Sequence, residues 1–344
     1  MKQAFPDIVA NRALCERLRD ELLSKTLSHA YIIEGAAGSG KHTLAWSLAA
    51  ALSCERQQDE TSPLPCGSCP SCRKILGGFS PDVIVKGRGE KATLGVDVIR
   101  ELRTDVYIPP NDNAVKIYIV EDAHLMTEQA QNAFLLTLEE PPAYVLFLLL
   151  CESAVPLLDT IRSRAPTLRT EPVPTDLIDA HLCRVSTEAA KLKSTDPHEF
   201  SEILAAANGS IGTALLLLDA KRRKPIVTRR AAARELVSLY ASRKSSAAVL
   251  RFLNSLPQKR DELCEQLAVM LTCLRDLLLC KQTEHAPLCF FADREEACSL
   301  AYGFTTPELL TLCDQLAQTQ DKLQRNANVR LTLTAFAVNA GLLS

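Results

Sequence analysis

A phosphate-binding loop follows a short apolar segment near the N-terminus of the chain. Residues 32–45 have the sequence IIEGAAGSGKHTLA, which matches G-x-x-x-x-G-K-S/T except that His42 replaces the hydroxyl residue. Glycines let backbone N–H groups turn towards phosphate oxygens, and the lysine adds a positive charge near them. The candidate nucleotide-binding residues of this loop are Gly35, Gly38, Ser39, Gly40, Lys41, His42 and Thr43. The alternative is a glycine-rich turn without a ligand.

The replacement of Ser or Thr by His42 affects the expected Mg²⁺ site more than the expected phosphate contacts. A Ser or Thr at this position gives Mg²⁺ a hard oxygen, and an imidazole offers none. Thr43 follows one residue later, on a different face of the expected helix, and is a poor substitute. We therefore expect ATP or ADP as the ligand, with or without Mg²⁺, and no efficient hydrolysis.

Two adjacent carboxylates, Glu121 and Asp122, follow a second apolar segment at residues 115–120. Carboxylates at this end of a strand handle the metal and the attacking water in P-loop NTPases. The usual order is Asp then Glu, and the reversed order places the shorter side chain where the base is expected. The alternative is that both residues cap a helix that begins near residues 126 and 127.

Four cysteines are close together in the sequence and have the spacing of metal ligands. Cys66, Cys69 and Cys72 are separated by two residues each, and Cys54 at the end of the first expected helix can supply a fourth thiolate. A closed set of four cysteines suits a structural, tetrahedral Zn²⁺ ion. An iron–sulfur cluster and four unligated thiols are the alternatives. The other nine of the thirteen cysteines are scattered and indicate core packing.

The bulk composition describes a globular chain with a large core. The 344 residues carry a net charge of −2, with 47% hydrophobic and 23% charged residues. Near-neutral charge gives no general attraction to nucleic acid. The start of the chain has no signal-peptide core, and the longest apolar run, at residues 144–151, is far too short to cross a membrane. We expect a cytoplasmic protein.

The elements that position these residues alternate between strand and helix up to about residue 168. Apolar strands are expected at 30–33, 82–85, 115–120 and 145–150, and helices at 43–52 and 93–106. This alternation predicts an α/β fold with a parallel sheet covered by helices on both faces. The remaining residues have helical periodicity, in a smaller segment at 169–220 and a longer one at 221–344.

Several segments match a known family in detail. Residues 132–142 are NAFLLTLEEPP, residues 157–164 are LLDTIRSR, residues 29–31 are HAY, and residues 326–331 are NANVRL. Together with the cysteine insertion, they resemble the bacterial DNA polymerase III clamp-loader subunits of the AAA+ superfamily, most closely the delta-prime branch. The resemblance covers essentially the whole chain.

The resemblance implies an architecture and a set of partners. It implies an AAA+ P-loop domain at 1–168 with a zinc module at about 54–72, a helical lid at 169–220 and a helical collar for oligomerisation at 221–344. The implied partners are the gamma/tau and delta subunits and, through the complex, the sliding clamp and primed DNA. The implied location is the replisome at the bacterial nucleoid, with no role for a membrane.

The chain departs from the catalytic gamma/tau motor at four positions. These are His42, the reversed Glu121-Asp122 pair, Cys151 in place of the sensor 1 Thr, and Gly212 in place of the sensor 2 Arg. Arg164 is kept, and in the family this Arg reaches a neighbouring subunit's ATP as an arginine finger supplied in trans. Ala165 replaces the Cys that usually follows it. The alternative for Arg164 is a surface or helix-capping role.

These observations lead to one functional interpretation and two alternatives. The interpretation is a delta-prime-like stator that helps load the sliding clamp, donates Arg164 and has a degenerate ATP site of its own, so that it is not an efficient ATPase alone. The first alternative is an active gamma/tau-like clamp-loader ATPase. The second is a zinc-bearing nucleic-acid-binding protein, for which the basic residues 221–224 and 229–230 would supply phosphate contacts.

Overall fold

The computed structural model describes residues 4–59, 61–242, 246–283, 286 and 288–342. The chain divides into two compact units, which we describe separately. The first comprises the residues up to His181 together with Ser210–Gly212, and the second comprises Leu182–Gly209 and the residues from Thr213 onwards. The ends of the expected domains at residues 1 and 344 lie outside the described residues.

The first unit contains a five-stranded sheet. The strands are β1 (Ala30–Glu34), β2 (Val83–Lys86), β3 (Lys116–Val120), β4 (Val145–Cys151) and β5 (Thr167–Arg169), in the spatial order β2-β3-β4-β1-β5. All four strand pairs are parallel, so the predicted parallel sheet is confirmed. All seven residues of β4 are buried, as expected for a strand covered on both faces.

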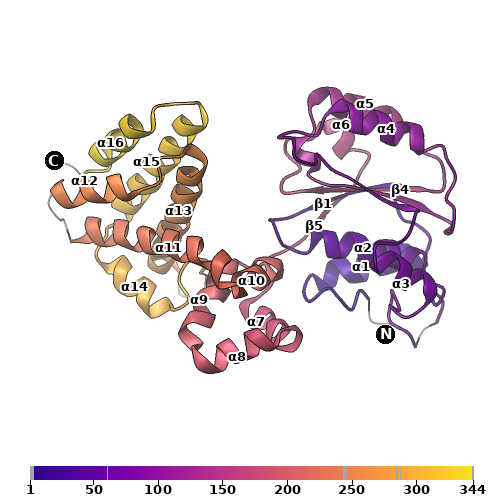
Figure 1. Cartoon of the computed structure of the whole chain (residues 1–344), viewed down its shortest axis with the longest axis horizontal. Helices are drawn as coiled ribbons and strands as arrows, with labels where there is room; N and C mark the ends of the chain where they lie inside the picture. Colours follow the sequence, from indigo (N-terminus) through magenta and orange to yellow (C-terminus); the bar gives the residue numbers. More distant parts are fainter. Residues whose placement is uncertain (1–3, 60, 243–245, 284–285, 287, 343–344) are drawn as a thin grey trace. The chain divides into compact units, whose positions relative to one another are not determined.

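Helices cover both faces of this sheet, as predicted (Figure 1). On one face lie α1 (Arg12–Leu23), α2 (Lys41–Leu52) and α3 (Pro70–Leu76), and on the other lie α4 (Val96–Asp105), α5 (Glu128–Glu139) and α6 (Asp159–Arg162). Alternate residues of β1 enter opposite layers of the core. Tyr31 and Ile33 pack with Leu48 of α2, whereas Ile32 packs in the cluster that contains Phe134 of α5.

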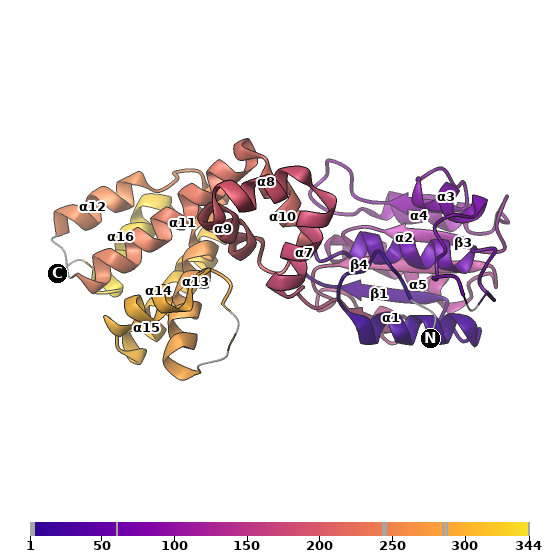
Figure 2. The ribbon, with the colours of Figure 1, turned by 90° about the horizontal axis from the view of Figure 1, so that it is seen from below.

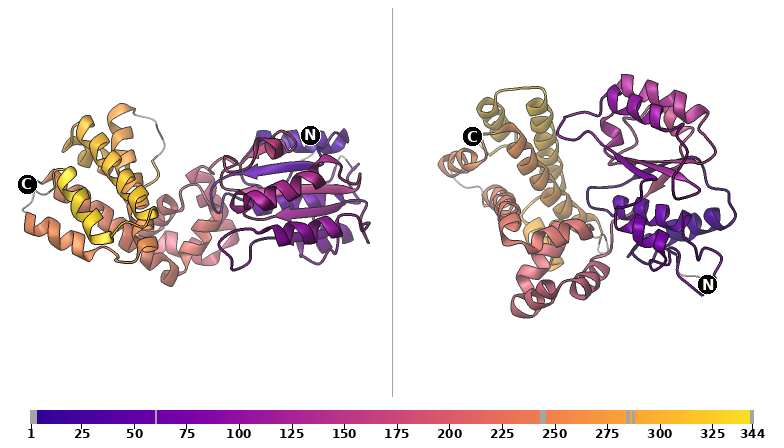
Figure 3. Two further views of the ribbon diagram at one scale, coloured as in Figure 1. Left: turned by 90° about the horizontal axis from the view of Figure 1, so that it is seen from above. Right: turned by 45° about the vertical axis from the view of Figure 1, so that its right-hand side comes forward.

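Within the described residues, ten further helices come after β5 in the sequence (Figures 2 and 3). They are α7 (Thr175–Val185), α8 (Thr187–Thr195), α9 (Pro197–Ala207), α10 (Ile211–Leu218), α11 (Ala220–Ala241), α12 (Ser246–Ser255), α13 (Arg260–Gln282), α14 (Arg294–Tyr302), α15 (Thr306–Gln324) and α16 (Val329–Asn339). One apolar core joins α11 to α16, with Leu263, Leu267 and Leu274 of α13 fully buried. The predicted all-α C-terminal region is therefore confirmed.

The basic run at the start of α11 is engaged within the second unit. Arg223 pairs with Glu199 at 2.9 Å. Arg230 is only 5% exposed, lies over the ring of Phe290 and pairs with Glu202 at 3.3 Å. These contacts favour a structural role for Arg223 and Arg230, whereas Lys221, Arg222 and Lys224 are exposed. Among the described helices, none is both long and apolar enough to cross a membrane.

Candidate functional site

The phosphate-binding loop connects β1 to α2, and its glycines are required by the backbone. Gly35 donates its N–H to the carbonyl oxygen of Cys151 over 3.1 Å. A Cβ atom at Gly35 would lie 1.9 Å from Oγ1 of Thr170, so no larger residue fits there without a shift. Gly38 and Gly40 have φ angles of 69° and 88°, in the left-handed region that favours glycine. Gly40 is also the N-cap residue of α2.

Lys41, the first residue of α2, extends its side chain across this loop. Its Nζ donates to the carbonyl oxygens of Gly35 and Ala36 over 2.6 and 2.7 Å. Burial lowers the pKa of Lys41, and nearby acidic groups, Glu152 foremost among them, oppose that shift. A bound phosphate would compete with the two carbonyl oxygens for the same ammonium group. The lysine thus lies where the sequence pattern predicts a phosphate contact.

Thr170, which the sequence analysis did not identify, forms hydrogen bonds that hold the loop in place. Its Oγ1 lies 2.8 Å from Oγ of Ser39, and both its Oγ1 and its N–H donate to the carbonyl oxygen of Glu34. The Glu34 carboxylate in turn accepts the N–H of Ala154 and Nε of Arg169, each over 2.9 Å. These contacts fix the end of β1 from which the loop starts. No local motif marks Thr170, because its partners are more than 130 residues away in sequence.

His42 faces the acidic end of β3. Its Nδ1 lies 3.4 Å from Oε1 of Glu121. Oε2 of Glu121 lies against Gly87, where an added Cβ would be 3.0 Å away. Thr43 is exposed in the first turn of α2. The structure therefore brings together His42 and Glu121, two of the predicted site residues.

Asp122 has a different partner. Its Oδ2 accepts Nε of Arg88 over 2.9 Å, and Nη1 of the same arginine donates to the carbonyl oxygen of Lys91. Thr127, whose Oγ1 accepts the N–H of Ala130, is the residue that caps α5. Asp122 precedes a 3₁₀ turn without a side-chain capping bond. The helix-capping alternative for the Glu121-Asp122 pair is therefore wrong.

Neither of the two positions that the resemblance assigns to nucleotide sensors carries a group suited to a phosphate. Cys151 is fully buried at the end of β4, and burial and the charge of Glu34 raise its pKa to about 12, against a smaller opposing effect of Lys41. Gly212 lies beside the loop, since a Cβ there would be 3.6 Å from Cα of Gly38. Nearby, Oγ of Ser210 donates to the carbonyl oxygen of Gly38 over 2.9 Å. The Gly212 position is close to the loop but offers no side chain.

Arg164 lies at the surface in the turn that follows α6. Its Nη1 donates to the carbonyl oxygen of Thr160 over 3.0 Å, and its Nη2 donates to Oε1 of Glu139 over 2.9 Å. The side chain is 36% exposed. Ala165, the next residue, is fully buried, so a small side chain fits at this position. The arginine is held by its own chain and remains accessible.

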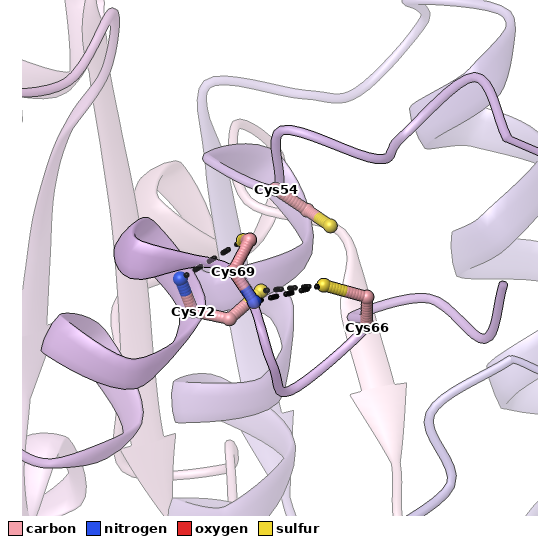
Figure 4. A group of neighbouring side chains, drawn as sticks. All are labelled: Cys54, Cys66, Cys69 and Cys72. Atoms are coloured by element: carbon pink, nitrogen blue, oxygen red, sulfur yellow. Dashed lines mark hydrogen bonds between the residues drawn. The ribbon is translucent and has the colours of Figure 1, made fainter.

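The four predicted cysteine ligands surround one point (Figure 4). Their Sγ atoms all lie within 4.8 Å of one another, and the sulfurs of Cys66 and Cys72 are 3.9 Å apart. Four thiolates bound to one tetrahedral Zn²⁺ at about 2.3 Å would be separated by about 3.8 Å. Cys54 follows α2, and Cys69 and Cys72 belong to the cap and first turn of α3. The donor set and its spacing fit a single tetrahedral ion.

Backbone N–H groups donate to two of these sulfurs, those of Cys66 and Cys69. The amide of Cys69 donates to Sγ of Cys66, and the amide of Cys72 donates to Sγ of Cys69, each over 3.4 Å. Burial raises the pKa of Cys66, but N–H groups of Cys69 and Ser68 outweigh it and lower the pKa to about 6. Thiolate is the form that binds a metal. Burial instead raises the pKa of the Cys54 and Cys72 thiols. Metal ligation is therefore favoured over four inert thiols by the spacing of the four sulfurs and by the contacts of Cys66.

Residues 10–174 match the family model described as DNA polymerase III, delta subunit. The matched region contains the P-loop, the cysteine cluster and Arg164. The family model and the relatives described below support a clamp-loader subunit of the AAA+ family. The resemblance to the clamp-loader subunits is thereby confirmed for residues 10–174.

Curated relatives of this chain include more than one kind of DNA polymerase III subunit. It is 32% identical to the DNA polymerase III subunit tau of Bacillus subtilis over 217 residues, which are 63% of this chain and 37% of that protein. It is 38% identical to the subunit delta' of Yersinia pestis over 138 residues, which are 40% of this chain and 39% of that protein. The chain thus covers less than two thirds of either relative.

A solved structure, the DNA polymerase III gamma subunit-related protein of Thermotoga maritima, aligns with 95% of this chain and 98% of its own. The identity is 19% and the TM-score is 0.42, which is too low to bear on function. Besides those of Thr170, two contacts at the candidate sites were absent from the sequence analysis, those of Arg88 and Glu139. Glu139 lies inside the NAFLLTLEEPP segment, so a signal for it was present, whereas Arg88 belongs to no motif.

Proposed function

We propose that this chain is a delta-prime-like subunit of the DNA polymerase III clamp loader, and that it donates Arg164 to the ATP site of a neighbouring subunit. The observation that carries the proposal is that Arg164 is accessible, whereas the chain's own nucleotide site lacks the residues typical of hydrolysis. Arg164 is accessible and oriented by Glu139 and Thr160. An arginine finger acts by reaching a phosphate that another subunit holds, and this geometry supports that role.

The chain's own nucleotide site supports the same proposal. His42 contacts Glu121, and Asp122 is paired with Arg88. A buried neutral thiol at Cys151 and a glycine at position 212 replace the two sensors. Hydrolysis needs a bound metal, an oriented water and charge stabilisation at the γ-phosphate. These residues are poorly suited to each of the three tasks. The site is a degenerate one that binds ATP or ADP without efficient turnover.

The partners and the domain roles form part of this proposal. The chain joins gamma/tau and delta subunits in a ring that loads the sliding clamp onto primed DNA in the bacterial cytoplasm, at the nucleoid. Residues 1–168 form the AAA+ domain, 169–220 the lid and 221–344 the collar that holds neighbours. The four cysteines hold a structural Zn²⁺ that stabilises the polar segment between α2 and α3.

The alternative is an active gamma/tau-like ATPase. Two observations favour it: the tau relative aligns over 217 residues against 138 for the delta' relative, and Lys41 keeps its place in an intact loop. In this alternative Thr43 or a water would replace the missing hydroxyl.

ATP hydrolysis by the purified chain distinguishes the two proposals. It is measured for the chain alone, then after addition of gamma/tau and delta subunits, primed DNA and sliding clamp. The stator proposal predicts no turnover alone and stimulation of the mixture. Robust turnover by the isolated chain, abolished by Lys41→Ala, would establish the motor alternative instead.

A further inference from the structure

The two carboxylates at the end of β3 are both engaged by basic groups of the protein. Asp122 accepts Nε of Arg88 over 2.9 Å, and Oε1 of Glu121 lies 3.4 Å from Nδ1 of His42. In a metal-dependent P-loop site, carboxylates at this place face the metal and its waters. Here a guanidinium and an imidazole lie beside them, so the protein itself supplies the basic partners.

The residues present do not fit Mg²⁺. This ion requires near-octahedral oxygen ligands and binds proteins through carboxylates and hydroxyls. His42 offers a nitrogen where the hydroxyl is expected, and its ring lies against Glu121. Thr43 is exposed one residue further along α2. An incoming Mg²⁺ would have to displace His42 from Glu121 and Arg88 from Asp122.

The part of the site that binds phosphate is nevertheless intact. Gly38 and Gly40 have the left-handed backbone that turns N–H groups inward. Lys41 lies across the loop with an ammonium group that a phosphate can recruit from two carbonyl oxygens. The N-terminus of α2, a helix of twelve residues, adds its positive end. Anion binding and metal binding are therefore separated in this chain.

We propose that the P-loop binds a nucleoside di- or triphosphate without Mg²⁺, with His42 and Arg88 as the partners of the acidic pair in place of the metal. This inference rests on the proposed degenerate nucleotide site. Lys41, the loop amides and the end of α2 balance the charge of the phosphates. Arg88 offsets the charge of Asp122, so that repulsion between this carboxylate and the ligand is reduced without a divalent ion.

The test is the affinity of the full chain for ADP and for ATP, measured by calorimetry with and without added MgCl₂. The buffer is freed of divalent ions with a chelating resin before the protein is added, because EDTA in solution would also compete for the proposed zinc. We expect dissociation constants that agree within about threefold in the two buffers. Lys41→Ala should weaken binding at least tenfold in both.

The variant His42→Thr restores the hydroxyl and removes the imidazole from Glu121. We expect its affinity for ATP to become at least tenfold stronger with Mg²⁺ than without. His198→Thr, the same change at an exposed histidine of α9, is the matched control and should leave both affinities unchanged. Zinc content and the melting temperature show that each variant is folded.

Two outcomes would overturn the inference: binding of the unaltered chain that needs Mg²⁺, or no binding of either nucleotide in either buffer. Both would leave the role of Arg164 intact, because that role does not require an occupied site in this chain. Phosphate release, measured in the same samples, separates the two proposals. Binding that requires Mg²⁺ and is followed by hydrolysis would contradict the proposed function as well.

Discussion

Nη2 of Arg164 lies 2.9 Å from Oε1 of Glu139, so the last residue of α5 holds the arginine that follows α6. A second contact, from Nη1 to the carbonyl oxygen of Thr160, fixes the plane of the guanidinium. An arginine held in this way loses less side-chain entropy when it meets a phosphate. Glu139 is therefore a positioning residue for Arg164 in the proposed function.

Replacement of Glu139 tests this relationship. The pair is at the surface, and such pairs contribute only about 0.2–1 kcal/mol to stability. Glu139→Ala should therefore change the melting temperature little, yet lower the ATPase rate of the assembled ring because Arg164 loses its orientation. Glu139→Gln keeps one hydrogen-bond acceptor and should retain more activity than Glu139→Ala. Equal activity of both variants and the unaltered chain would contradict the positioning role.

The cysteine cluster predicts one zinc ion per chain, measured by mass spectrometry of the purified protein. Cys66→Ser should lose the ion and lower the melting temperature, because the segment from residue 54 to 72 has little apolar core of its own. Cys298→Ser, at an exposed cysteine of α14, is the control and should keep the ion. Zinc should be released as the pH falls, since protons compete for the thiolates. Retention of zinc by Cys66→Ser would contradict the assigned ligand set.

Asp82 is fully buried at the start of β2, and it predicts a dependence of stability on pH. Burial raises its pKa, but the N–H groups of Asn111, Asp112 and Asn113 outweigh burial and bring the pKa below the usual value. A carboxyl with a lowered folded-state pKa adds stability above its unfolded pKa and loses it as the pH falls through the folded one.

Asp82→Asn preserves the shape of the side chain but places an amide donor among N–H groups. We expect a loss of about 1–3 kcal/mol in the free energy of unfolding at pH 7. The difference from the unaltered chain should shrink in acid, where Asp82 is itself protonated. Denaturant unfolding at several pH values measures it, with the exposed Asp97→Asn as control. A difference independent of pH would mean that the charge of Asp82 is not what stabilises the turn at residues 111–113.

The sequence predicted those features that depend on local patterns. The apolar run of β4 and the glycines of the P-loop led to the parallel sheet, and the cysteine spacing led to a cluster that the structure brings within 4.8 Å. Contacts between distant side chains were not predicted. Arg88 meets Asp122 across 34 positions and Glu139 meets Arg164 across 25, and only the packing of the sheet and its helices brings such partners together.

In the proposed function, Arg164 acts in a neighbouring subunit's ATP site. The most direct measurement is the DNA- and clamp-stimulated ATPase rate of the assembled ring with Arg164→Ala, beside the control Arg162→Ala, which removes a nearby exposed arginine paired with Asp159. An arginine finger is worth about a thousandfold or more at the site it serves. We therefore predict that Arg164→Ala abolishes ATP hydrolysis at the neighbouring site and lowers the ATPase rate of the ring severalfold. Arg162→Ala should do neither. Equal rates for the two variants in a fully assembled ring would contradict the account.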